Sequence, residues 1–162
     1  MVTYSPSFAR SRAFTGTQPG NFSDMPKKSA PARVLVVDDE ALIRWTLAEM
    51  LGDRGYDVTE ARDGREAIAA VESVADAFDV VLLDYRLPDS SDLRLLVTLK
   101  GLAPSTRIIM VTAHSSPELT QGAAALGAFR VISKPFELES LAALVDLARE
   151  DRSSSLNDGS SL

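Results

Sequence analysis

The sequence contains no cysteine and a single histidine, His114, and this scarcity excludes several kinds of site. Without cysteine the chain cannot form a disulfide, a thiolate nucleophile or a cysteine-ligated metal cluster. One histidine excludes a metal site built from several histidines of the same chain. No apolar run approaches the roughly 20 residues that a bilayer-spanning helix needs, so we expect no membrane partner.

Basic side chains are in the minority over most of the chain, which has a formal net charge of −6. Residues 33–150 contain 12 Lys and Arg against 20 Asp and Glu, whereas residues 1–32 contain four bases and one acid. Phosphate contacts need clustered Lys and Arg, so direct nucleic-acid binding by the acidic part is not expected. An acidic domain is better suited to a divalent cation or a basic partner.

The two ends of the chain differ in composition from its middle. Residues 1–32 are rich in Ser, Pro, Gly, Thr and Ala without apolar periodicity, which predicts a disordered N-terminal extension. Met25 is an alternative start, so residues 1–24 are either an inert segment or a basic arm. The Ser-rich residues 151–162 are predicted to be a disordered C-terminal tail. Residues 33–150 are long enough for one folded domain.

Between residues 33 and 150, apolar runs alternate with stretches of helical periodicity. The clearest run, Val80–Leu83, is continuous and apolar, which indicates a strand buried on both faces. Five strands are expected, each followed by a helix, at residues 33–37, 56–61, 80–83, 107–111 and 129–132. This alternation predicts an α/β fold with one open, doubly wound parallel sheet and helices on both faces.

Four of the five expected strands end in polar side chains, which are Asp38 with Asp39, then Asp84, Thr112 and Lys134. Because the carboxyl ends of parallel strands lie at one edge of a sheet, these groups should converge. Carboxylate oxygens are ligands that Mg²⁺ prefers, and a divalent cation relieves their mutual repulsion. A carboxylate can also attack phosphorus to form an acyl phosphate, while a metal and a lysine stabilise the transferring group. Asp is also a common turn or cap residue, so that simpler role stays open.

Four short motifs at these strand ends resemble those of the bacterial two-component response-regulator receiver domain, a chemotaxis-regulator-like fold. They are Val36–Glu40, Leu82–Pro88, Val111–Ala113 and Lys134–Phe136. The resemblance extends over residues 33–150. It implies a flavodoxin-like (βα)5 fold with strand order 2-1-3-4-5, a cytoplasmic location and a role in phosphorelay signal transduction.

The resemblance implies a phosphoacceptor role for Asp84, which would receive a phosphoryl group from a sensor histidine kinase or a phosphotransfer protein. Asp39 would bind Mg²⁺ directly, and Asp38 would hold the metal through water or position it. The main-chain carbonyl of Arg86 would be a further metal ligand beside Asp84. A role for Asp38 as a helix cap alone remains an alternative.

The resemblance also implies that Thr112 hydrogen-bonds the new phosphoryl oxygen and draws its loop inward. Lys134 would form an ion pair with the phosphoryl group, and its bond to Pro135 would be cis, which is otherwise a minority form. Val131 departs from the family pattern, because many receivers carry there a Tyr or Phe that rotates on phosphorylation. Phe129, two residues earlier, is expected to point to the same face as Val131.

Two other side chains near these motifs have two interpretations each. His114 lies two residues beyond Thr112, and it either tunes hydrolysis of the acyl phosphate or is an ordinary loop histidine. Trp45 lies on the first helix, and we expect it to be partly buried against a neighbour, with contact to a partner protein as the alternative.

Together these patterns predict a stand-alone response regulator that signals by phosphorylation-dependent docking. The docking face would comprise the fourth helix, the fifth strand and the fifth helix. The chain is not expected to be an enzyme, beyond phosphorylating and dephosphorylating itself. One alternative is a constitutive interaction module that is rarely phosphorylated, which Val131 favours. A second is an aspartyl-phosphate hydrolase, although Arg86 stands where such enzymes usually carry a second Asp. A third is a fragment of a larger transcriptional activator.

Overall fold

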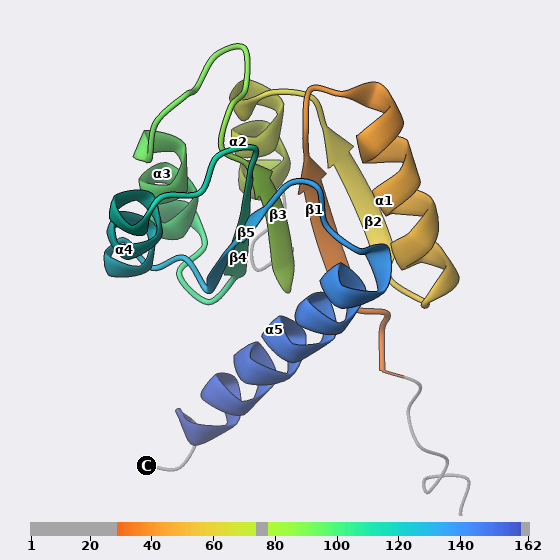
Figure 1. Cartoon of the computed structure of the whole chain (residues 1–162). Helices are drawn as coiled ribbons and strands as arrows, with labels where there is room; N and C mark the ends of the chain where they lie inside the picture. Colours follow the sequence, from red (N-terminus) through yellow and green to blue (C-terminus); the bar gives the residue numbers. More distant parts are fainter. Residues whose placement is uncertain (1–28, 74–77, 160–162) are drawn as a thin grey trace, which may run out of the picture.

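The computed structural model describes residues 29–73 and 78–159, which form one five-stranded parallel sheet with helices on both faces (Figure 1). The strands are β1 (Arg33–Val37), β2 (Asp57–Ala61), β3 (Val80–Asp84), β4 (Arg107–Thr112) and β5 (Arg130–Ser133). The helices are α1 (Ala41–Asp53), α2 (Gly64–Ser73), α3 (Arg94–Leu102), α4 (Pro117–Ala125) and α5 (Leu138–Asp158). The strand order is β2-β1-β3-β4-β5, which confirms the predicted fold class and order.

The alternation of side chains along the strands divides the core into two layers. On β1, Leu35 and Val37 belong to the layer packed against α2, α3 and α4, whereas Val34 and Val36 belong to the layer packed against α1 and α5. Every residue of the central strand β3 is buried, as its continuous apolar run predicts. The sheet is therefore fixed on both faces, and its strand ends are rigid supports for the polar groups that follow them.

The prediction of a disordered C-terminal tail is wrong for residues 151–158, because α5 continues through them to Asp158. The three serines of this stretch turn their hydroxyls back onto carbonyls one turn earlier, as Ser153 does to the carbonyl of Arg149. Arg107 at the start of β4 pairs with Asp151, and Arg152 pairs with Asp79 next to β3. Tertiary ion pairs thus hold a helical segment that its serine-rich composition does not favour.

The prediction that Phe129 shares a face with Val131 is also wrong. Phe129 packs against the layer of α1 and α5, and Val131 packs against the opposite layer. The reason is that β5 begins at Arg130, so Phe129 lies outside the strand and its side chain does not follow the two-residue alternation.

Some predictions concern residues outside the described part of the chain. The predicted N-terminal extension falls largely within residues 1–28, and the alternative start at Met25 lies there too. Among the helices of residues 29–73 and 78–159, none combines the length and the apolar character needed to cross a bilayer.

Candidate functional site

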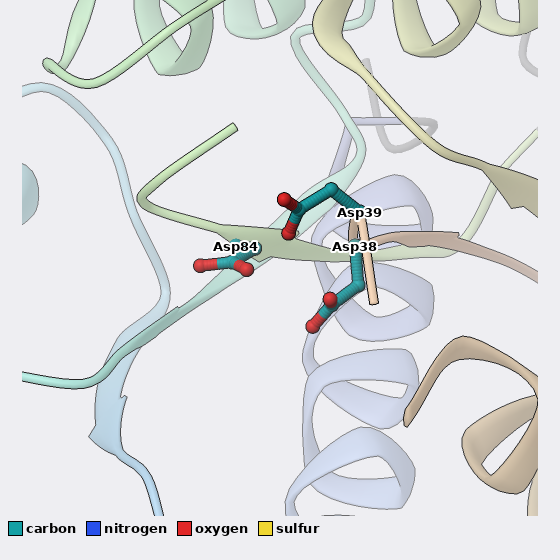
Figure 2. A group of neighbouring side chains, drawn as sticks. All are labelled: Asp38, Asp39 and Asp84. Atoms are coloured by element: carbon teal, nitrogen blue, oxygen red, sulfur yellow. The ribbon is translucent and has the colours of Figure 1, made fainter. Parts of the chain in front are cut away.

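The carboxyl edge of the sheet brings together acids that are far apart in sequence. Asp38 and Asp39 follow β1, and Asp84 is the last residue of β3. One carboxylate oxygen from each of the three lies within 4.8 Å of the others, and Figure 2 shows the three side chains gathered at this edge. Asp38 and Asp84 are buried, whereas Asp39 is exposed, so the cluster opens to solvent on one side.

Lys134, which follows β5, provides the positive charge closest to these acids. Its Nζ lies 3.0 Å from Asp38 Oδ2 and 3.2 Å from Asp84 Oδ2, with Glu40 Oε1 at 3.6 Å. The Lys134–Pro135 peptide bond is cis, as the resemblance implies. The ammonium group therefore bridges the two buried carboxylates.

Both oxygens of Asp84 are engaged, which fixes the orientation of its carboxylate. Oδ2 accepts from Lys134, and Oδ1 accepts from the main-chain N–H of Arg86 at 3.1 Å. The Oδ1 atom of Asp38 accepts from the N–H of Glu40 at 2.8 Å, so Asp38 supports the start of α1 as well as facing the cluster. One oxygen of Asp38 thus holds the backbone before α1, and the other accepts from Lys134 in the cluster.

The electrostatics of the cluster reflect the competition between burial and charge pairing. Burial raises the pKa of Asp84, and the neighbouring charge of Asp38 raises it further, while the Arg86 N–H and Lys134 oppose the rise. Burial alone would lower the pKa of Lys134, but its hydrogen bond to Asp38 and the charges of both acids outweigh this, so the pKa is raised. Lys134 is therefore firmly cationic at neutral pH.

The donor set fits a small, hard divalent cation. Three carboxylates supply oxygen atoms within the separation that one ion can bridge, and the exposed Asp39 leaves room for the waters that Mg²⁺ retains. Crowded negative charge at a partly buried position is also a reason for the cation to bind. The predicted main-chain ligand, Arg86, lies two residues beyond Asp84 and is tied to it through its N–H.

Thr112 ends β4 beside β3, but its hydroxyl is engaged in the loop that follows. Thr112 Oγ1 donates to the carbonyl of His114 at 3.1 Å and accepts from the N–H of His114 at 3.2 Å. His114 is exposed, and it contacts Thr112 through its backbone. Val131 on β5 is half-buried against the core and pairs in register with Met110 of β4.

Arg44 on α1 is a site neighbour that the sequence analysis did not identify as functional. Its Nη1 donates to the main-chain carbonyl of Asp38 at 2.7 Å, and its Nε donates to Glu60 at 3.2 Å. Arg44 thus links the acidic loop to β2. Its position one turn after Glu40, the residue just before α1, was the available sequence signal.

A doubly wound parallel sheet with three carboxylates and a lysine at its carboxyl edge defines an α/β protein of the flavodoxin-like class, with its site where that class binds ligands. The family model described as the response regulator receiver domain matches residues 34–146. The chain belongs to this family, which confirms the predicted resemblance.

Similar proteins agree with this assignment. The chain is 38% identical over 123 residues to the transcriptional regulatory protein PdtaR of Mycobacterium tuberculosis (strain ATCC 25618 / H37Rv), covering 74% of this chain and 58% of that protein. It is 38% identical over 115 residues to the DNA-binding transcriptional regulator NtrC of Salmonella typhimurium, covering 71% and 24%. The chain thus spans somewhat over half of PdtaR and about a quarter of NtrC.

Solved structures show the same fold. A CheY-like response regulator receiver domain protein from Methanospirillum hungatei JF-1 superposes with a TM-score of 0.73 at 29% identity, over 77% of this chain and 98% of that one. The Vibrio cholerae chemotaxis protein CheY4 gives a TM-score of 0.68 at 35% identity, over 74% and 99%. The described domain is therefore a receiver domain of response regulators.

Proposed function

We propose that this receiver domain accepts a phosphoryl group on Asp84 from the phosphohistidine of a sensor kinase or phosphotransfer protein. The observation that carries the proposal is the setting of Asp84, which is buried, oriented through both oxygens and placed between two acids and Lys134. A carboxylate held in this way has the fixed orientation that an attack on phosphorus requires.

The proposed transfer is a displacement at phosphorus. An oxygen of Asp84 forms a bond to the phosphorus atom, the phosphorus–nitrogen bond of the phosphohistidine breaks, and the imidazole leaves with the electron pair and takes up a proton. Lys134 Nζ, now 3.2 Å from Asp84 Oδ2, is close enough to pair with the transferred group. Asp38, Asp39, Asp84 and the carbonyl of Arg86 would hold Mg²⁺, which when bound offsets negative charge on the phosphoryl oxygens.

Thr112 provides a route from the phosphorylated aspartate to the surface. Its hydroxyl now holds the backbone of His114, so donating to a phosphoryl oxygen requires that it give up the bond to that carbonyl. The loop before α4 would then rearrange, and the face formed by α4, β5 and α5 would change for a downstream partner. Such coupling is a shift between two surface states. The protein would act on no substrate other than its own aspartate and the acyl phosphate that it hydrolyses.

The test is formation of an acyl phosphate. The protein and an Asp84→Asn variant are incubated with acetyl phosphate and Mg²⁺, and intact masses are recorded. We expect one added phosphoryl group on the wild type, none on the variant, and none on the wild type in excess EDTA. Labelling of Asp84→Asn at the wild-type level would place the acceptor elsewhere and refute the proposal.

A second candidate function is a constitutive interaction module, favoured by Val131 in place of a rotating aromatic side chain. In that case a partner would bind equally well before and after treatment with acetyl phosphate or a beryllofluoride mimic. The phosphorylation switch would be favoured if the affinity for the partner rises when the wild type is treated and does not change when Asp84→Asn is treated.

A further inference from the structure

The start of α2 is held by a residue from a different loop. The first four N–H groups of a helix have no partner within it. At α2 the N–H of Gly64 donates to Asp89 Oδ1 at 2.8 Å and that of Arg65 donates to Asp89 Oδ2 at 3.0 Å. The next N–H groups are satisfied by Asp63, through its side chain at 2.8 Å and its carbonyl at 3.1 Å. Asp89 thus completes the cap of a helix from which it is separated by a whole strand.

The fit between Asp89 and α2 depends on the absence of a side chain at residue 64. A Cβ atom on Gly64 would lie 3.1 Å from Leu95 Cδ2 and 3.2 and 3.3 Å from the two carboxylate oxygens of Asp89. These separations are shorter than ordinary van der Waals contact, so a methyl group would displace the carboxylate or the leucine. The hydrogen bonds to the helix lower the pKa of Asp89, that from Gly64 having the largest effect.

Asp89 belongs to the loop between β3 and α3, which also contains Arg86. The loop closes on itself through two hydrogen bonds between the backbones of Leu87 and Ser90, at 2.7 and 3.2 Å. Those bonds shape the turn but do not attach it to the rest of the molecule. Attachment comes from the buried side chain of Leu87 and from the carboxylate of Asp89 on α2. Arg86 therefore lies between Asp84, fixed at the end of β3, and a turn fixed on α2.

We propose that Asp89 is a positioning residue for the cation site: by tying the β3–α3 turn to the start of α2, it holds the backbone of Arg86 in place to serve as a ligand. This inference rests on the proposed function, since it concerns the affinity of the same site for Mg²⁺. Asp89 itself is not a ligand in this proposal. Its loss removes the polar attachment of the turn to α2, and the backbone ligand becomes less ordered.

The experiment compares Mg²⁺ binding by the wild type with that of three variants, followed through the backbone amide shifts of residues 84 and 86. Asp89→Ala removes the tie. Asp92→Ala is the matched control, because Asp92 lies in the same loop and carries the same charge, but its polar contacts at 2.9 Å are with Arg94, two residues away, and not with α2. Gly64→Ala changes no charge, but its methyl group crowds the carboxylate of Asp89.

We expect the Mg²⁺ dissociation constant to rise about tenfold in Asp89→Ala, which is the size of effect produced by losing a group that orients a metal ligand. In Asp92→Ala the dissociation constant should stay within about twofold of the wild-type value. At saturating Mg²⁺ the rate of labelling by acetyl phosphate should return to the wild-type value, because the tie affects binding and not the attack. If Asp89 had a merely structural role, Asp89→Ala would lower the melting temperature but would not weaken Mg²⁺ binding while keeping the labelling rate at saturating Mg²⁺.

An increase in Asp89→Ala no larger than in Asp92→Ala overturns the proposal. If Asp89→Ala does not fold, Gly64→Ala decides in its place, and an unchanged dissociation constant there overturns the proposal equally. A wild-type protein that shows no Mg²⁺-dependent shifts would refute the proposed function itself, and this inference with it. A wild type that binds Mg²⁺ while Asp89→Ala binds it equally well refutes this inference alone.

Discussion

Replacing Arg152 with alanine should destabilise the whole domain, although the residue lies near the end of the last helix. Arg152 Nη1 pairs with Asp79, which lies just before β3, and the two side chains are 12% and 20% exposed. Asp79 also accepts from the N–H of Arg33 at 2.8 Å, so it joins α5 to β1. The ion pair is neither fully buried nor a surface pair.

The size of the effect follows from this intermediate burial. Exposed ion pairs contribute about 0–1 kcal/mol, whereas hydrogen bonds to charged groups contribute about 1.5–3 kcal/mol. Because Asp79 keeps its bond to the Arg33 N–H after the change, we expect Arg152→Ala to lower the free energy of unfolding by about 2 kcal/mol. For a domain of this size that corresponds to a melting temperature lower by roughly 6–10 °C.

The assay is urea unfolding followed by circular dichroism, together with amide hydrogen exchange over residues 150–158. Short helical segments are marginal alone, so the last two turns of α5 should exchange much faster in Arg152→Ala. Arg149→Ala is the control, because Arg149 is exposed on the same helix and its replacement removes the same positive charge. We expect its free energy of unfolding to stay within about 0.5 kcal/mol of wild type. Equal effects of the two variants, or unchanged exchange in Arg152→Ala, would refute the docking of α5 described above.

Three further predictions concern other groups. Burial and a hydrogen bond to Asp146 raise the pKa of Tyr56. The contribution of Tyr56 to the free energy of unfolding is therefore complete below the ordinary tyrosine pKa of about 10 and is lost as the pH rises above that value. Tyr56→Phe should therefore lower the free energy of unfolding by about 1 kcal/mol at pH 7 and remove this part of the alkaline decline in a urea series from pH 7 to 11; an unchanged decline contradicts the assignment. Lys134→Met removes the cation that competes for Asp38 and Asp84, so Mg²⁺ should bind several-fold more tightly in an amide-shift titration, and weaker binding would show that Lys134 organises the acids instead. Thr112→Val should still be labelled by acetyl phosphate but should lose the phosphorylation-dependent change in amide shifts over α4 and β5, and a full change there would exclude its hydroxyl as the link.

Much of the fold and the site could be predicted because their signals are local. The continuous apolar run of β3 and the β-branched run of β1 specify buried strands without reference to any other part of the chain. Once five strand–helix repeats are recognised, the common direction of the strands places Asp38, Asp84 and Lys134 at one edge. The structure shows Lys134 within hydrogen-bonding distance of both acids.

The features that sequence analysis missed depend on contacts between distant residues. The last turns of α5 have a serine-rich composition, and their helical state depends on Asp79 and Arg107, which lie 73 and 44 residues from their partners. Asp89 caps α2 from 25 residues away, with no periodic pattern to reveal it. Phe129 was placed on the wrong face because the alternation rule holds only within a strand, and Phe129 lies just before the first residue of β5, Arg130.

The way in which the site is assembled has a practical consequence for experiments. Lys134 is 96 residues from Asp38 and 50 from Asp84, so the cluster exists only while the sheet is intact. Under the proposed function, the amount of phosphate incorporated would therefore measure the fraction of native molecules. A domain with the usual 5–15 kcal/mol of stability stays almost fully folded after a loss of about 2 kcal/mol. Arg152→Ala should thus be labelled as completely as the wild type at 25 °C, and the two should diverge only on heating, when the weakened molecules melt first.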